Sequence, residues 1–109
     1  METDDWDYFE EKIATCVLIQ DFSFPDAIGD LCRKNPMRDA NALLLAAISF
    51  VTHLDQDSTL VENEAHEICI DWYRLIAVLA ADMALMPFGT RTCGDLQMFW
   101  MRTNSEAFR

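Results

Sequence analysis

The chain has 109 residues, 51% of them hydrophobic, and only three are glycine and three are proline. This composition excludes a disordered or low-complexity chain, and the length suits one domain, which we expect to cover residues 1–109. Nineteen acidic residues against eight basic ones give a formal net charge of -11, which disfavours direct binding to nucleic acid and to anionic membranes.

Two helices are predicted in the first third of the chain. Over residues 4–19, apolar residues recur at spacings of three and four, and aspartates occupy the start, where the helix dipole favours negative charge. Ser23 and Asp26 stand three residues apart with Pro25 between them, which predicts a second helix over residues 24–34. The apolar positions of the first helix are Trp6, Phe9, Ile13, Cys16 and Val17.

The next two predicted helices form an antiparallel hairpin. Asn35 and Pro36 are typical of an N-cap and a first helical residue, so we expect the third helix over residues 36–54. Thr59 and Glu62 have the spacing of a capping box, which predicts a fourth helix over residues 60–86.

The second half of the fourth helix is a nearly unbroken apolar run from Leu75 to Met86. The run is shorter than the roughly 20 residues that a membrane span needs, so we expect protein to enclose it. A helix over residues 60–86 would be roughly 40 Å long, more than its shorter neighbours cover. Two interpretations stay open: a second copy covers the surplus in a homodimer, or the last helix and Phe88 cover it within one chain.

The last predicted helix covers residues 93–102. Thr92 and Asp95 repeat the capping spacing at its start, and a polar tail follows from Thr103. No run of alternating β-branched residues indicates a strand. The predicted fold class is therefore all-α, a compact bundle of about five helices around a long central helix hairpin.

Asp82 interrupts the apolar run of the fourth helix. An ionised carboxylate in such surroundings is costly unless it pairs with an arginine or accepts hydrogen bonds, and we expect an ion pair with an arginine. The candidates are Arg74, Arg91 and Arg102. A structural ion pair explains Asp82 better than a catalytic role.

Glu62, His66 and Cys69 are spaced so that they share one face of the fourth helix, as zinc ligands can. A fourth ligand would have to come from His53 or Asp55. We favour the simpler interpretation, in which Cys69 belongs to the core and His66 to a solvated acidic surface. No metal and no cofactor are therefore expected.

The four cysteines are far apart in the sequence and form no CxxC pair. Since no signal peptide precedes them, we expect free, buried thiols in a cytoplasmic protein. They are Cys16, Cys32, Cys69 and Cys93.

No catalytic constellation can be assembled from the sequence. Ser49 and Ser58 lack a glycine-rich elbow, and there is no phosphate-binding glycine loop. We therefore expect a protein that is not an enzyme.

The acidic residues form two runs, Glu2–Glu11 and Asp55–Asp71, neither of which contains lysine or arginine. We predict that their carboxylates face a basic protein partner. The predicted partner-binding residues are Asp4, Asp5, Asp7, Glu10, Glu11, Asp55, Asp57, Glu62, Glu64, Glu67 and Asp71.

The leading functional hypothesis is a small inhibitor or regulator that covers a nucleic-acid-binding surface of another protein, with carboxylates standing in for phosphates. It gains support if the two acidic runs share one face, whereas runs on opposite sides would mainly solubilise the protein. The alternatives are a helical bundle that binds a small apolar ligand or a metal, and an obligate homodimeric assembly subunit.

Overall fold

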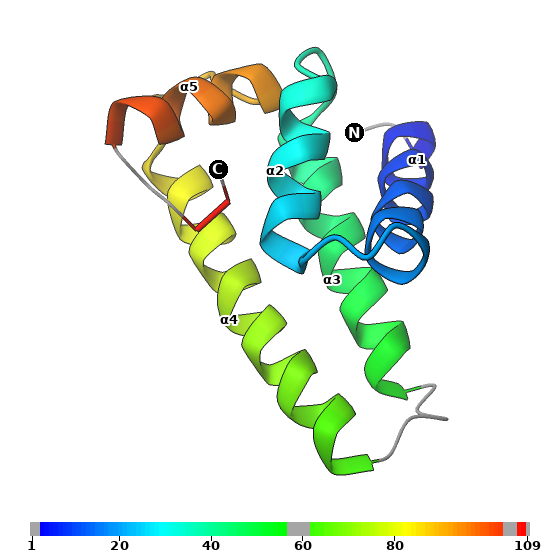
Figure 1. Cartoon of the computed structure of the whole chain (residues 1–109). Coiled ribbons are helices and arrows are strands. Elements are labelled where there is room, and N and C mark those ends of the chain that lie inside the picture. The colour runs from blue at the N-terminus through cyan, green and yellow to red at the C-terminus, as the bar shows by residue number, and fades with distance from the viewer. Residues whose placement is uncertain (1–2, 57–61, 104–106, 109) are drawn as a thin grey trace.

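The computed structural model describes residues 3–56, 62–103 and 107–108; for residues 3–4 and 62–66 it describes the backbone only. These parts of the chain form five α-helices and one π-helical turn, and the predicted all-α bundle is confirmed (Figure 1). The elements are α1 (Thr3–Ala14), η1 (Thr15–Ile19), α2 (Phe24–Lys34), α3 (Ala40–Gln56), α4 (Glu62–Leu85) and α5 (Cys93–Thr103).

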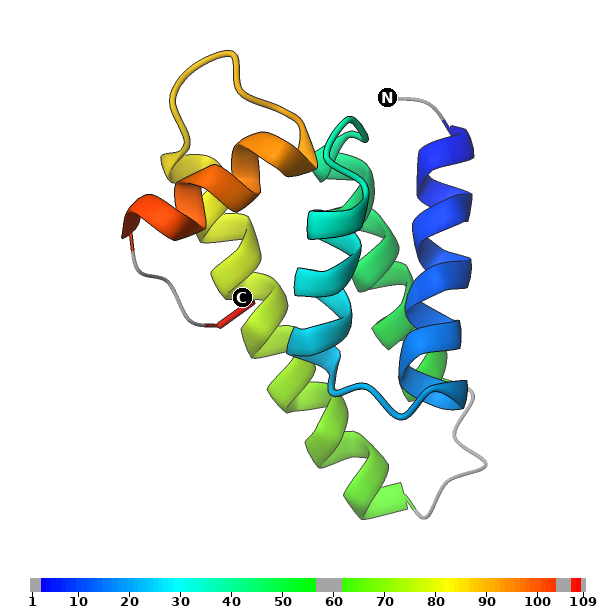
Figure 2. The same cartoon turned by 45° about the horizontal axis from the view of Figure 1, so that its top comes forward.

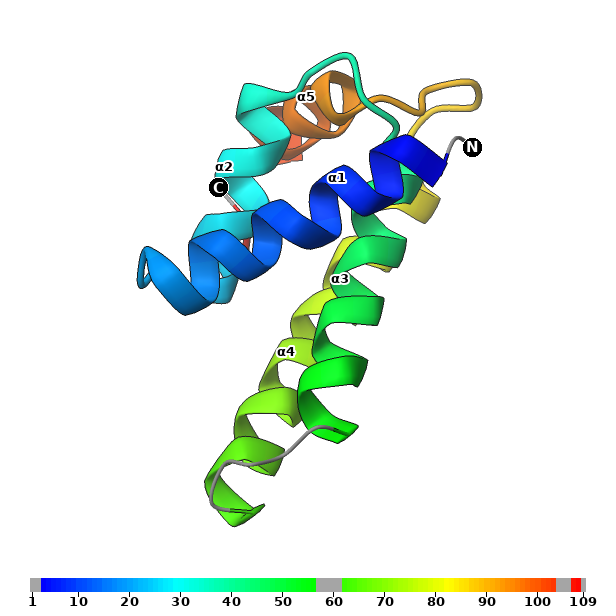
Figure 3. The same ribbon diagram turned by 90° about the vertical axis from the view of Figure 1, so that its right-hand side faces the viewer.

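The helices are arranged around the predicted antiparallel hairpin, which α3 and α4 form. α1 packs against α3 on the side away from α4 (Figure 1). α2 contacts α1, α3 and α5, and α5 crosses the end of α4, as Figure 2 shows. The other end of the hairpin extends beyond the remaining helices (Figure 3).

One hydrophobic core joins the five helices. Trp72 of α4 stacks on Phe24 of α2 with ring centroids 5.2 Å apart, and on Phe50 of α3 at 6.1 Å. Burial of such large aromatic surfaces is the main force that holds α2 against the hairpin. The largest fully buried side chains include Phe9, Phe24, Ile13, Ile28, Leu43, Leu79, Leu96 and Trp100.

The end of the chain contributes to this core, contrary to the polar tail predicted from Thr103. Phe108 is fully buried and stacks on Trp100 of α5, with ring centroids 5.7 Å apart. Burial of this aromatic ring brings the end of the chain back to the bundle.

The predicted start of the third helix at Pro36 is wrong. Asn35 ends α2 instead, where its side-chain Nδ2 donates a hydrogen bond to the Leu31 carbonyl at 2.8 Å. Asp39 caps α3 by accepting a hydrogen bond from the Asn41 backbone N–H at 2.8 Å. The second helix, predicted over residues 24–34 with Asn35-Pro36 ending it, is therefore confirmed, and only the predicted second role of Asn35, as N-cap of the next helix, is wrong.

The residues between α2 and α3 pair with the loop that precedes α5. Asp39 and Thr92 form an isolated antiparallel bridge. We call residues 36–40 together with 91–94 the loop junction. Backbone hydrogen bonds from Ala40 N to Arg91 O, from Cys93 N to Arg38 O and from Gly94 N to Pro36 O, of 2.8, 2.8 and 2.9 Å, complete it.

The predicted cap of α2 is confirmed, since the Ser23 hydroxyl accepts a hydrogen bond from the Asp26 backbone N–H at 3.2 Å. The predicted cap of α4 cannot be compared, because Thr59 and the side chain of Glu62 lie outside the described residues.

The predicted cap of α5 is also confirmed. The Thr92 hydroxyl accepts from the Asp95 backbone N–H at 3.1 Å, and the Asp95 carboxylate accepts from the Thr92 backbone N–H at 3.2 Å. The hydrogen bond from the Thr92 backbone N–H is the main reason that the pKa of Asp95 lies below its ordinary value, because this bond favours the ionised carboxylate. The start of α5 is therefore fixed inside the loop junction.

We predict that Gly94→Ala destabilises the fold. A Cβ atom at this position would lie 3.0 Å from the Pro36 carbonyl oxygen and 3.2 Å from the Pro36 Cβ. Helix propensity alone would make this substitution stabilising by about 0.5–1 kcal/mol, whereas overpacking costs about 1–3 kcal/mol. A lower free energy of unfolding in urea denaturation is expected, and an unchanged or higher one would show that the loop junction is loosely packed.

Candidate functional site

Two of the predicted partner-binding carboxylates are engaged within the chain. Asp5 forms an ion pair with Arg38, with 2.6 Å between Oδ1 and Nη1. Glu10 accepts a hydrogen bond from the Ser49 hydroxyl at 2.9 Å, and His53 Nδ1 lies 3.2 Å from the same carboxylate oxygen. Both acids therefore tie α1 to α3 and its preceding turn, and they are less available to a partner.

The other acids of α1 point to solvent. Asp7 and Glu11 are exposed, one helical turn apart, while Phe9 and Ile13 are buried beneath them. No ion pair within the described residues involves Asp7 or Glu11. These two carboxylates are therefore free to interact with another molecule.

The end of α1 widens into the π-helical turn η1. Gln20 N donates to Thr15 O at 3.0 Å, a step of five residues, and Asp21 follows with a left-handed φ of 62°. Leu18 and Ile19 fall outside the buried stripe and are 61% and 79% exposed. Neither residue is among the sites predicted from the sequence, although both are apolar residues outside the spacing of that stripe.

We call the surface made by Asp7, Glu11, Leu18 and Ile19 the α1 face. It places two carboxylates ahead of two exposed aliphatic side chains on one continuous helical segment. Such a combination can steer a basic partner electrostatically and then supply apolar contact area.

The acids of α4 lie elsewhere on the molecule. α1 and α4 are on opposite sides of α3 (Figure 1), so the described acids of α4, Glu67 and Asp71, do not share one face with those of α1. Asp55 is half-buried, whereas Glu67 and Asp71 are exposed and Asp71 Oδ1 lies 3.4 Å from Arg74 Nη1. Asp57 and the side chains of Asp4, Glu62 and Glu64 lie outside the described residues.

Apolar side chains are exposed on α4 and α5: Val78 and Leu85 of α4 are 39% and 72% exposed, and Met98 and Met101 of α5 are 53% and 65% exposed, with Leu85 and Met98 lining one groove. Neither the last helix nor Phe88 covers Val78 and Leu85, so the interpretation in which the chain covers all of α4 itself is wrong for this part. The groove has a volume of about 350 Å³ and is lined by Leu85, Met98, Phe99 and Arg102 among others.

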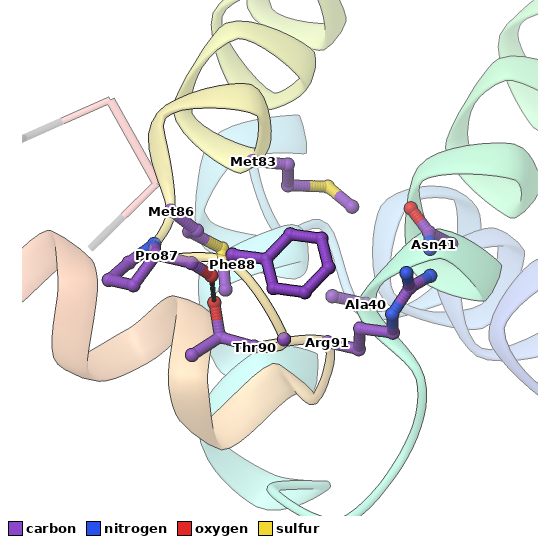
Figure 4. A pocket seen from close by; sticks show the side chains of 9 residues that line it. Ala40, Asn41, Met83, Met86, Pro87, Phe88, Thr90 and Arg91 are labelled. Atoms are coloured by element: carbon purple, nitrogen blue, oxygen red, sulfur yellow. Dashed lines mark hydrogen bonds between the residues drawn. The ribbon is translucent and has the colours of Figure 1, made fainter.

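A smaller hollow of about 220 Å³ lies where the end of α4 meets the start of α3, as Figure 4 shows. Met83, Met86 and the fully exposed Phe88 line it, and Gly89 turns the chain there with a left-handed φ of 91°. Its volume is below the roughly 300–1,000 Å³ that is usual for small-molecule sites. This hollow therefore gives little support to the alternative in which the bundle binds a small apolar ligand.

The suggested zinc ligands are not brought together in the described part of the chain. Cys69 is buried, while the side chains of Glu62 and His66 lie outside the described residues. Among the residues that the structure describes, no group of three or more His, Cys, Asp or Glu is close enough to hold a metal ion.

All four cysteines are buried and form no disulfide, as predicted. Cys32 Sγ donates a hydrogen bond to the Cys93 carbonyl at 3.0 Å. Hydrogen bonding with the Cys93 side chain, followed by burial, raises the pKa of Cys32. Burial also raises the pKa of Cys16 and of Cys69. Since the thiolate is the reactive form, these three thiols are poor nucleophiles.

The prediction that Asp82 pairs with an arginine is wrong. Its carboxylate Oδ2 accepts a hydrogen bond from the indole Nε1 of Trp100, 2.9 Å away. Asp82 is half-buried and Trp100 is fully buried, so the bond satisfies a polar group of the core. This contact joins α4 to α5 and engages the one carboxylate of the apolar run in a structural role.

Comparisons with protein-family models, with curated proteins and with solved structures find nothing similar to this chain. None of the helices in the described ranges combines the length and apolar character that crossing a membrane requires.

We predict that Asp82→Ala lowers the free energy of unfolding by about 1–3 kcal/mol, because it leaves the buried Trp100 N–H without this acceptor. Asp82→Asn keeps an acceptor oxygen and should lose clearly less. Urea denaturation of both variants measures the difference. An asparagine variant as unstable as the alanine variant would show that the negative charge, rather than the hydrogen bond, is what matters.

Proposed function

We propose that this chain is a non-catalytic helical protein that acts by binding a basic protein partner, and that the α1 face is its docking surface. The observation that carries the proposal is the alignment of unpaired Asp7 and Glu11 with exposed Leu18 and Ile19. The four residues combine long-range attraction with apolar contact area.

The charge balance supports a basic partner. The chain carries a formal net charge of -11, and several of its few cations are already paired internally. Arg33 and Lys34 both bind Asp30, at 2.6 and 3.1 Å, and Arg38 binds Asp5. The remaining negative charge is not neutralised within the chain, so it attracts a positively charged protein over distances of about a Debye length.

The proposed regulatory role depends on the type of protein surface that the α1 face would bind. A protein surface that binds nucleic acid is rich in lysine and arginine, and carboxylates on one helix can compete for it. Asp7 and Glu11 are one turn apart, a spacing of roughly 6 Å between Cβ atoms. The acids of α1 and of α4 do not share one face, so mimicry by both runs loses support and the α4 acids mainly solubilise the protein. The proposed activity is inhibition or regulation of a nucleic-acid-binding protein by α1 alone.

Absence of catalysis is part of the proposal. Burial and the raised pKa values of Cys16, Cys32 and Cys69 argue against a nucleophilic thiol. The sheltered Asp82 is engaged by Trp100. The buried, unbridged thiols are also what a reducing compartment such as the cytoplasm maintains.

We predict that Glu11→Lys weakens capture of a basic protein from the source cell's lysate by about tenfold, because it replaces attraction with repulsion on the α1 face. Asp7→Lys combined with Glu11→Lys should abolish capture. Quantitative mass spectrometry of proteins retained by tagged wild type and variants, washed at low and high salt, gives the measurement.

Glu67→Lys is the matched control, since it makes the same charge change at an exposed site of α4. It should leave capture unchanged. Equal losses for Glu11→Lys and Glu67→Lys would mean that only net charge matters, and retention of no basic protein at either salt concentration would contradict the proposed function.

A further inference from the structure

The two lysines of the chain, Lys12 and Lys34, line the same pocket. Lys12 is on α1 and Lys34 is the last residue of α2, so two different helices bring them to one site. The pocket has a volume of about 270 Å³, and we call it the α1–α2 pocket. In a chain with a net charge of -11, the placement of both lysines at one pocket indicates a site for an anion.

Positive charge exceeds negative charge at the α1–α2 pocket. Asp30 is the one acidic residue among those that line it, and its carboxylate binds Arg33 Nη2 at 2.6 Å and Lys34 Nζ at 3.1 Å. Lys12, Arg33 and Lys34 thus provide three positive charges in or beside the pocket against this single negative one. Asp30 is neutralised within the chain, and positive charge remains for a ligand.

The charges of the pocket act on one point, the thiol of Cys16, which also lines it. Burial raises the pKa of Cys16 most, the Asp30 charge raises it further, and the Lys34 and Lys12 charges lower it. Both ammonium groups therefore lie close enough to the base of the pocket to act on a group placed there.

The pocket also keeps hydrogen-bond donors that the chain itself does not use. In the described part of the chain Lys12 forms no ion pair, and its Nζ lies 5.6 Å from the centroid of the Tyr8 ring. Lys34 has three N–H donors and gives one to Asp30, while Asn35 Nδ2 gives one of its two to a backbone carbonyl. An anion with several acceptor oxygens satisfies the donors that remain.

A phosphate group matches these features best. It carries about -1.5 to -2 charge at neutral pH and several acceptor oxygens, and lysine ammonium groups bind it as point charges. Glu11 and Asp21, the acids next to the α1 part of the pocket in the sequence, are exposed and do not line it. The pocket volume is below the roughly 300–1,000 Å³ that is usual for small-molecule sites, so the phosphate group is free or belongs to a very small molecule.

We propose that the α1–α2 pocket binds a phosphate dianion, free or as the phosphoryl group of a small molecule, between Lys12 and Lys34. This inference goes beyond the proposed function and does not rest on it, because it uses the side of α1 that lies against α2 and needs neither Asp7 nor Leu18.

Titration of the ¹⁵N-labelled full chain with sodium phosphate tests the proposal by nuclear magnetic resonance, with sodium chloride adjusted to keep the ionic strength constant. Amide signals of residues 8–20 and 30–35 should shift to saturation with a dissociation constant of about 1 mM. Sodium acetate, a monoanion, should bind at least about tenfold more weakly. A parallel titration with glycerol phosphate distinguishes the two sources: tighter binding than that of inorganic phosphate assigns the site to an organic phosphate, and equal or weaker binding assigns it to the free ion.

Lys12→Gln and Lys34→Gln should each weaken phosphate binding by about tenfold, since each removes one charge-assisted hydrogen bond. Arg74→Gln is the matched control, because it removes the same charge from an exposed site of α4 and should leave binding unchanged. The spectra themselves show whether each variant is folded. No saturable shift below about 30 mM phosphate, an unchanged dissociation constant in either lysine variant, or equal weakening by Arg74→Gln would overturn the proposal.

Discussion

The loop junction is the constraint on which the arrangement of this fold depends. Asp39 and Thr92, which cap α3 and α5, are paired with each other, so two helices that are far apart in sequence begin at one point. Gly94 allows the backbones to approach there. The junction directs α5 across the end of α4, and this crossing places Trp100 beside Asp82 and Met98 beside Leu85.

α3 divides the surface of the molecule into two regions of different chemistry. On one side, α1 shows Asp7 and Glu11 to solvent, while Asp5 and Glu10 hold the helix in place. On the other side, the second half of α4 shows apolar side chains and no charge. Electrostatic attraction acts at long range and apolar burial only on contact, so the two regions suit different partners. This is the basis for assigning a basic protein to the α1 side.

Local patterns were enough to predict five helices, the Ser23 and Thr92 caps and the buried cysteines. Apolar spacing and capping residues depend on neighbours within one helical turn, which a sequence shows directly. The features that were missed depend on tertiary contacts. The third helix starts at Ala40 and not at Pro36 because residues 36–40 pair with a loop some fifty residues later, and Asp82 bonds to Trp100 because of the crossing of α5. Leu18 and Ile19 lie outside the apolar spacing of the first helix, so their exposure could have been predicted, whereas the π-helical turn that contains them could not.

The central claim is that the α1 face is the docking surface for a basic protein, and hydrogen exchange of the chain with and without the basic protein that it captures tests this claim most directly. We expect the bound protein to slow exchange in residues 7–19 and to leave residues 67–71 of α4 unchanged. Slower exchange over α4 with no change over α1 would contradict the claim.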